Sequence, residues 1–252
     1  MSTFLSIDID YWDGKKAIRQ MTGFMKKVFD LDVPIQVKID HHELLPFIKK
    51  SECRNIINVD AHSDLADFPQ KSGSLRIKMD LNCGTWATHV PEKQKEKFIW
   101  IYPEKTCYEY EHCGVDGKYV TRGSGRCDML KNPFLGNSKK LCGWEKIEKR
   151  LAKLPTNSEL KEVSHVGICI SPDYTAFSTM IKILEMLYDK GLITIRMFHK
   201  SLSLFLKTSG YDSSEIKMFE KSPYLRLNQK NKTYIVKKSI KPFLEKRYVT
   251  AN

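Results

Sequence analysis

Short apolar runs alternate with longer amphipathic stretches along most of this chain. The runs "FLSIDID", "PIQVKID", "NIINVDAHSD", "KFIWIYP" and "SHVGICISPDYT" are rich in β-branched or aromatic residues, which is typical of buried strands. Between the first two, apolar residues recur at helical spacing, as at Ile18, Met21 and Met25 within residues 15–31. Residues 41–50 and 176–191 also predict helices, and Gly191 is a typical helix-ending residue.

The alternation of strands and helices predicts an α/β fold, in which parallel strands are joined by right-handed crossovers. We expect a three-layer α/β/α arrangement with a mainly parallel sheet, formed as a single domain over residues 1–252. Residues 104–145 lack periodicity and predict an irregular insertion or lid. Further along, "LITIRMF" predicts a strand or short segment, and residues 234–252 predict a strand followed by a helix.

The bulk composition narrows the class of protein. With 252 residues, 41% of them hydrophobic, the chain is long enough to bury a substantial core. The N-terminus lacks the pattern of a secretory signal, and no apolar run approaches the ~20 residues that cross a bilayer. We therefore expect a cytoplasmic protein without a membrane span, and its seven cysteines, which form no Cys-x-x-Cys pair, are typical of free thiols there.

The net charge of +12 is large enough to attract an acidic partner. Nucleic acid and an acidic peptide segment are both candidates, and a plain lysine-rich surface explains the same charge. No feature of the sequence predicts an oligomeric state.

Polar residues gather where the predicted strands end, and the ends of parallel strands meet at one edge of a sheet. Asp8 and Asp10 are two residues apart in the first run, so we expect their side chains to project to the same side. The second and third runs lead into two further clusters: Asp40, His41, His42 and Glu43 in "DHHE", and Asp60, His62 and Asp64 in "DAHSD".

Carboxylate oxygens and imidazole nitrogens together suit a divalent ion such as manganese. Aspartates held this close together repel one another unless a cation lies among them. Two ions about 3.5–4 Å apart can also lower the pKa of a water between them toward neutrality. We therefore expect a site for two Mn²⁺ ions, with other divalent metals as alternatives.

Each cluster also has a plainer interpretation. An Asp-x-Asp pair after a strand is often a turn or a helix cap, and paired histidines are often polar surface. In addition, "DIDYWDG" resembles the nucleophile loop of haloacid-dehalogenase-like phosphatases, in which Asp8 would attack phosphorus and Asp10 would act as acid and base. That interpretation leaves "DHH" and "DAHSD" without a role.

Taken together, the motifs resemble the arginase (ureohydrolase) superfamily. "DAHSD" resembles its Asp-x-His-x-Asp motif, "SIDID" its Ser-x-Asp-x-Asp motif and "DHH" its Gly-Asp-His corner. With "GTWATHV", "FIWIYP" and "ISPDYT", the chain is similar to a divergent arginase-like family that includes peptide arginases, which convert arginine residues of ribosomal natural-product precursors to ornithine. The resemblance covers roughly residues 4–103 and 165–176.

The resemblance implies a ligand set for two manganese ions. Asp60 and Asp8 would bridge the ions, and the remaining ligands would be Asp64 with His41 for the first ion and His62 with Asp10 for the second. His42 stays open as an alternative to His41, because the doubled histidine leaves the alignment ambiguous by one residue. In most arginases the Ser-x-Asp-x-Asp strand comes late in the chain, whereas here it comes first.

The activity implied is the hydrolysis of a guanidinium group, with Asp60 and His62 at its centre. We expect Asp173 to hold the guanidinium by charge-assisted hydrogen bonds, unless it is only a helix cap. His89 is the candidate proton donor, unless it is a surface histidine, and Glu43 could orient the corner histidines. An arginine-containing precursor peptide with an acidic leader is the expected partner. A phosphatase, a basic nucleic-acid-binding protein and a hydrolase of acetylated amines are the alternatives.

Overall fold

The computed structural model describes residues 2–12, 14–62, 64–65, 81, 84–103, 143–208, 213–230 and 233–249. Nearly all of the insertion or lid predicted over residues 104–145 lies outside these described residues. The chain forms two compact units: unit 1 comprises residues 1–11 and 30–169, and unit 2 comprises residues 12–29 and 170–252. Each unit joins two separate stretches, so neither is contiguous in sequence. The single domain expected over residues 1–252 stays a prediction.

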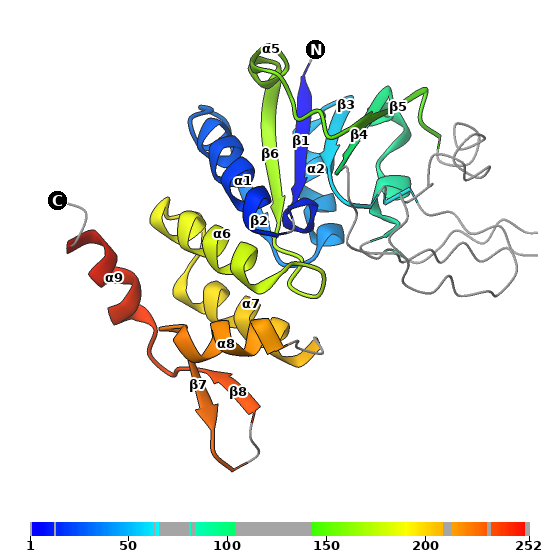
Figure 1. Ribbon diagram of the computed structural model, residues 1–252. Coiled ribbons are helices and arrows are strands. Elements are labelled where there is room, and N and C mark those ends of the chain that lie inside the picture. The colour runs from blue at the N-terminus through cyan, green and yellow to red at the C-terminus, as the bar shows by residue number, and fades with distance from the viewer. Residues whose placement is uncertain are drawn as a thin grey trace, which may run out of the picture. The chain divides into compact units, whose positions relative to one another are not determined.

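Unit 1 contains a six-stranded sheet in the order β2-β6-β1-β3-β4-β5 (Figure 1). Every neighbouring pair is parallel. The strands are β1 (Thr3–Asp8), β2 (Ile35–Lys38), β3 (Asn55–Val59), β4 (Lys97–Tyr102), β5 (Lys146–Leu151) and β6 (Val163–Cys169). A parallel sheet flanked by helices confirms the predicted three-layer α/β/α class.

The order of the strands creates a reversal point beside β1. After β1 the chain moves to β2 on one side of the sheet, and it then crosses to β3 and continues outward to β5 on the other side. In register, Ile7 lies opposite Val59 of β3, and Asp8 lies opposite Cys169 of β6. The carboxyl ends of these three strands therefore meet at a reversal point, which is where open α/β sheets bind ligands.

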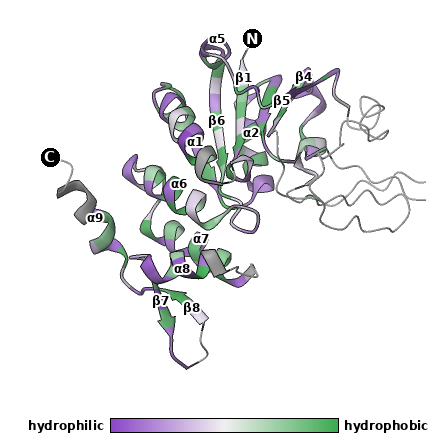
Figure 2. Ribbon diagram, in the orientation of Figure 1, coloured by the Kyte–Doolittle hydropathy of each residue, from purple (hydrophilic) through white to green (hydrophobic). Residues whose placement is uncertain are grey.

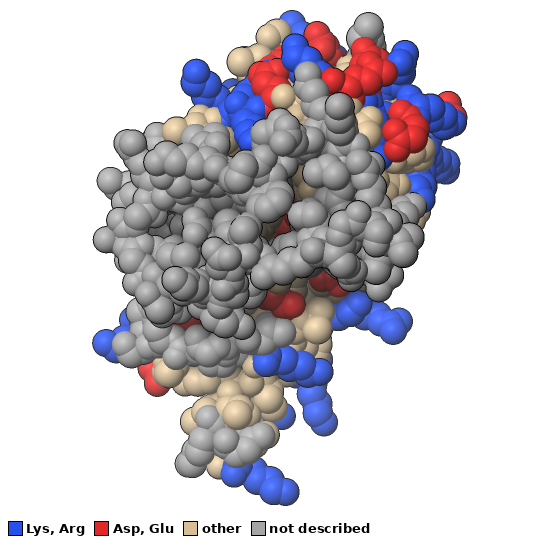
Figure 3. All heavy atoms as spheres, turned by 90° about the vertical axis from the view of Figure 1, so that its right-hand side faces the viewer, with Lys and Arg blue, Asp and Glu red and all other residues tan. Residues whose placement is uncertain are grey.

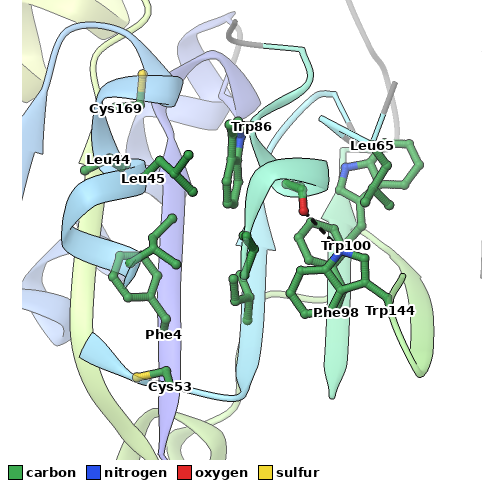
Figure 4. Packing of buried hydrophobic residues seen from close by; sticks show 14 residues of the cluster. Phe4, Leu44, Leu45, Cys53, Leu65, Trp86, Phe98, Trp100, Trp144 and Cys169 are labelled. Atoms are coloured by element: carbon green, nitrogen blue, oxygen red, sulfur yellow. Dashed lines mark hydrogen bonds between the residues drawn. The ribbon is translucent and has the colours of Figure 1, made fainter. Parts of the chain in front are cut away.

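The core of unit 1 packs large aromatic and aliphatic side chains against the sheet. Phe4, Trp86, Phe98 and Trp144 are each at most 1% exposed. Figure 4 shows Cys169 and Trp86 at one end of this cluster and Cys53 at the other, with the indole N–H of Trp144 donating to a backbone carbonyl. That acceptor is the oxygen of Ala87, at 3.2 Å. The core thus extends up to the strand ends where the polar clusters lie.

Short helices of unit 1 follow the strand ends. They are η1 (Ile9–Tyr11), η2 (His41–Leu44), α2 (Leu45–Ser51), η3 (Trp86–His89), η4 (Glu92–Gln94) and α5 (Asn157–Lys161). The helix predicted over residues 41–50 is therefore a 3₁₀ turn followed by an α-helix. Pro46 lies in the first turn of α2, where a missing backbone N–H breaks no helical hydrogen bond.

The described residues of unit 2 are helical apart from one antiparallel pair of strands. The elements of this unit are α1 (Gly14–Phe29), α6 (Phe177–Asp189), α7 (Ile195–Thr208), α8 (Ser213–Lys221), β7 (Leu225–Asn228), β8 (Thr233–Val236) and α9 (Lys241–Val249). Figure 2 shows hydrophobic and hydrophilic residues mixed along α6 and α7, as in helices with one buried face. The predicted strand in "LITIRMF" is wrong, because Phe198, Leu202 and Phe205 continue a helical repeat and are buried.

Candidate metal centre

Three chain segments bring acidic and histidine side chains to the carboxyl edge of the sheet in unit 1. Asp8 ends β1 and Asp10 lies in η1, so the strand alternation that we expected to align them ends before Asp10. That reasoning was wrong, although both residues reach the same cluster. The backbone N–H of Asp10 donates to Oδ1 of Asp8 at 3.2 Å, which shows that the turn itself brings the two residues together.

His41 lies at the centre of the first grouping. Its Nδ1 atom is 2.9 Å from Oδ2 of Asp64, 3.1 Å from Oδ2 of Asp60 and 3.3 Å from Oδ2 of Asp8. All four residues are buried, and His41 is 1% exposed. The strand that ends in "SIDID" is adjacent to the strand that ends in "DAHSD", but β6 separates it from the strand that leads to "DHH".

The geometry around His41 fits a metal ion. Although three carboxylate oxygens surround Nδ1, none is placed to complete a hydrogen bond with this buried atom. A first-row divalent ion holds oxygen and nitrogen ligands at about 2.1 Å, which puts neighbouring ligands of an octahedral ion roughly 3.0 Å apart. The distances of 2.9–3.3 Å between Nδ1 and the oxygens match that spacing.

His62 lies at the centre of the second grouping. Its Nδ1 atom is 3.0 Å from Oδ2 of Asp10 and 3.7 Å from Oδ1 of Asp60. Asp10, Asp60 and His62 each offer one ligand atom within 4.8 Å of the others, as do His41, Asp60 and Asp64. Oδ2 of Asp10 is also buried without a hydrogen-bond partner. The second grouping therefore repeats the donor chemistry of the first.

Asp60 belongs to both groupings and uses a different oxygen in each. Oδ2 faces His41 and Oδ1 faces His62, at the distances given above. The side-chain amide of Asn58 donates to Oδ2 at 3.2 Å, and the backbone N–H of His62 donates to Oδ1 at 2.7 Å. The carboxylate is thus held in the orientation that a bridge between two ions requires.

The electrostatics of the cluster reflect buried negative charge. Burial, together with repulsion from Asp8 and Asp60, raises the pKa of Asp10 to about 7. Burial and repulsion from Asp64 raise the pKa of Asp60 to about 8. A cation among these carboxylates would relieve both effects.

The two imidazoles respond in the opposite sense. Burial lowers the pKa of His62, but the carboxylate of Asp10, 3.0 Å from its Nδ1, outweighs burial and raises the pKa to about 10. Burial likewise opposes protonation of His41, yet attraction by Asp64, Asp60 and Asp8 raises its pKa well above the ordinary value. A divalent ion would therefore displace protons from these rings as it binds.

The local structure fixes His41 from several sides. Glu43 accepts hydrogen bonds from the backbone N–H groups of Ile39 and Asp40, both at 3.2 Å, and so closes the turn that presents His41. Ser6 Oγ lies 2.6 Å from Nε2 of His41. When Nδ1 acts as a ligand, the ring proton sits on Nε2 and is donated to Ser6. Glu43 thus acts on this corner through the backbone.

Trp86 contacts two members of the first grouping, and we did not predict it from the sequence. Its indole N–H donates to Oδ2 of Asp64, and its ring lies 4.7 Å from the His41 ring, centroid to centroid. Asp64 has a φ of 54°, in the left-handed region that aspartate adopts more readily than most residues. A buried indole N–H usually finds an acceptor, and this was the signal available in "GTWATHV".

Other predicted site residues lie outside the two groupings. His42 is half-buried with its Nδ1 lacking a hydrogen-bond partner, and His89 is the last residue of η3. Asp173 is an exposed residue of unit 2, in a turn before α6. It is not the cap of that helix, because the N-cap is Ala176. Cys169, which was not predicted, lies within 4.8 Å of Asp8 and His41 through its sulfur.

No helix among the described residues is both long and apolar enough to cross a bilayer. A scan against protein-family models matched none of them, and searches of curated proteins and of solved structures likewise found no match to this chain.

Proposed function

We propose that this chain is a metal-dependent hydrolase of guanidinium groups that converts arginine residues of a peptide to ornithine and releases urea. The observation that carries the proposal is the position of Asp60, whose two oxygens face His41 and His62 in two separate groupings. This arrangement supports a pair of ions sharing one carboxylate. We propose Mn²⁺ as the metal, because the donors are carboxylate oxygens and imidazole nitrogens.

The residues that would hold the first ion are Asp8, His41, Asp60 and Asp64, and those for the second are Asp10, Asp60 and His62. When bound, two such ions lower the pKa of a water between them and so supply a nucleophile at neutral pH. The protein contributes rigid positioning, since Asn58 and Trp86 donate hydrogen bonds to Asp60 and Asp64, and His41 donates one to Ser6.

The proposal also accounts for residues that a phosphatase would leave unused. Asp8 is 4% exposed, and one of its oxygens faces the ring of His41. A nucleophile for phosphorus needs an open approach to its oxygen, which this position does not favour. The candidate roles of Asp173 in binding the guanidinium and of His89 in donating a proton remain part of the proposal, as does a cytoplasmic location.

The direct test incubates the full chain with Mn²⁺ and short arginine-containing peptides, with free arginine in parallel. We expect urea together with the peptide mass loss that converting arginine to ornithine requires. Urea from free arginine alone would correct the substrate, and phosphate release from a phosphoester would favour the phosphatase. A chain that binds the metal but releases no urea from any of these compounds would refute the proposal.

A further inference from the structure

The net positive charge of this protein comes from one of its two units. Unit 2 contains 20 lysines and arginines against 8 aspartates and glutamates, and unit 1 contains 22 of each kind. The whole excess of +12 therefore lies in unit 2, whereas the unit that holds the candidate metal centre is neutral overall. On the face in Figure 3, red and blue side chains are interspersed at the upper end, and mostly blue side chains, with a few red ones, are visible in the lower part.

Within unit 2, α7 carries a basic face. Arg196, Lys200 and Lys207 are spaced four and seven residues apart, so they lie on the same side of the helix, and all three are exposed. The opposite side buries Phe198, Leu202 and Phe205. We call the exposed side, defined by Arg196, Lys200 and Lys207, the basic face of α7.

Helix stability does not explain the basic face. Arg196 lies in the first turn of α7, where a positive charge is unfavourable because it meets the positive end of the helix dipole. Arg196 and Lys200 are also like charges at a repelling spacing. The helix contains no aspartate or glutamate, and no ion pair to these three residues occurs among the described parts of the chain. A face kept only for solubility would mix both signs.

We propose that the basic face of α7 binds an acidic peptide segment. Its three charges extend over 11 residues of helix, or about 16 Å at 1.5 Å per residue. An extended chain covers that length with about five residues, and alternate side chains point to one side. A segment with acidic residues at alternate positions can therefore meet all three cations at once.

The apolar surface of the described residues favours a peptide over nucleic acid. Among the side chains that the structure describes, the exposed large hydrophobic residues include no aromatic ring: Leu81, Leu151, Ile216, Met218 and Leu227. Three of these, Ile216, Met218 and Leu227, belong to unit 2. Proteins that bind single strands without sequence preference stack bases on exposed aromatic rings, and aliphatic side chains offer no such platform. They can pack against the apolar side chains of a peptide.

The acidic segment could be the leader of the precursor peptide, and this assignment rests on the proposed function. A leader bound to unit 2 would raise the local concentration of the arginine attached to it. Binding by the basic face does not depend on it. The test measures fluorescence anisotropy of the full chain with a short labelled peptide of alternating Glu and Ser. The same peptide with Gln in place of Glu, and a short single-stranded DNA of equal charge, serve as comparisons.

The variant replaces Arg196, Lys200 and Lys207 with alanine, which preserves the helix. We expect about a tenfold loss of affinity for the Glu peptide, since each exposed ion pair contributes a factor of about two. The matched control replaces three exposed lysines of unit 1, Lys49, Lys153 and Lys161, and should bind as the wild type does.

The outcomes separate this inference from the proposed function. Asp60→Asn should bind the Glu peptide normally, and the α7 variant should keep its metal response and its hydrolysis of short arginine peptides. Equal losses in the α7 variant and the control variant would mean that only net charge matters and would overturn the proposal. Tighter binding of the DNA, with the same dependence on α7, would overturn it in favour of nucleic acid. Peptide binding without any urea release would remove the link to a substrate.

Discussion

The substitution Asp60→Asn should have opposite effects on the metal-free and the metal-loaded protein. Asparagine keeps the shape of the side chain and one of its acceptor oxygens, but it removes the charge between His41 and His62. In the metal-free protein that charge is unfavourable, because burial and Asp64 raise the pKa of Asp60 to about 8. In the metal-loaded protein, by contrast, the substitution would remove the carboxylate that the two ions share.

The sign follows from proton linkage. An acid whose folded-state pKa is raised binds more protons in the folded than in the unfolded protein, so stability falls as pH rises from about 4 to 8. At pH 7 this corresponds to destabilisation of the metal-free wild type on the order of a few kcal/mol. The metal-free Asp60→Asn variant should therefore be at least as stable as the wild type at pH 7. Its free energy of unfolding should also fall less steeply than that of the wild type as pH rises from about 4 to 8.

With metal bound, the wild type should be more stable than Asp60→Asn. An ion present at 100 times its dissociation constant stabilises the folded state by about 2.7 kcal/mol. For a chain of this size that is a rise in melting temperature of roughly 5–10 °C. The wild type should show this rise on addition of Mn²⁺, and Asp60→Asn should not. The exposed Asp32, also in unit 1, provides the matched control, because Asp32→Asn should behave as the wild type does.

The assay is thermal unfolding after removal of metal by a chelator, with and without added Mn²⁺, at several pH values. The opposing hypothesis is that the cluster is a structural ion-pair network, in which a positive His41 is neutralised by aspartates. On that hypothesis, removing one charged partner costs about 3–5 kcal/mol, and Mn²⁺ has no effect on the wild type. A destabilised metal-free variant together with an unresponsive wild type would refute our reasoning.

Three further predictions concern other residues. Trp86→Phe keeps an aromatic ring beside His41 but removes the donor to Asp64, so calorimetric titration should show Mn²⁺ affinity about 10–100-fold weaker; an unchanged affinity would contradict the contact. His41→Gln should abolish the rise in melting temperature with Mn²⁺ and His42→Gln should not, and the reverse result would exchange their roles. Arg150 and Lys97 lower the pKa of Glu148 to about 2, so this carboxylate contributes stability above pH 4.5 that is lost as pH falls toward 2. In an acid titration, Glu148→Gln should flatten that loss by less than about 1 kcal/mol, and a steeper loss would contradict the assignment.

The sequence predicted strands best where an uninterrupted run of apolar residues matches a strand that is buried on both faces. The run "FLSIDID" predicted a buried strand because its apolar residues are contiguous, and β1 is buried along its full length. The strand β5 was missed, because "KIEKRL" alternates charged and apolar residues weakly. Its position explains the composition, since β5 is an edge strand, and charged side chains on an edge discourage pairing with other chains.

The candidate centre was predictable in its members and less so in its geometry. The residues of "SIDID", "DHH" and "DAHSD" stood out because charged side chains directly follow apolar strands. Their arrangement depends on turns that the pattern does not encode, such as the 3₁₀ turn that contains Asp10 and the left-handed backbone of Asp64. Trp86 is more than twenty residues from the last motif, so only the folded chain could reveal its contact with Asp64.

The place of β1 explains why chain order need not match the order of motifs in a site of this kind. A ligand at the carboxyl edge of a parallel sheet is surrounded by whichever strands are adjacent in space. Here β1 begins the chain and still lies at the middle of the sheet, because β3, β4 and β5 extend one side while β2 and then β6 occupy the other, with β6 filling the place between β2 and β1. Asp8 therefore meets Asp60 across one strand boundary, and His41 reaches the same point from beyond β6. A first strand is well suited to this position, since every later strand can add to either side of it.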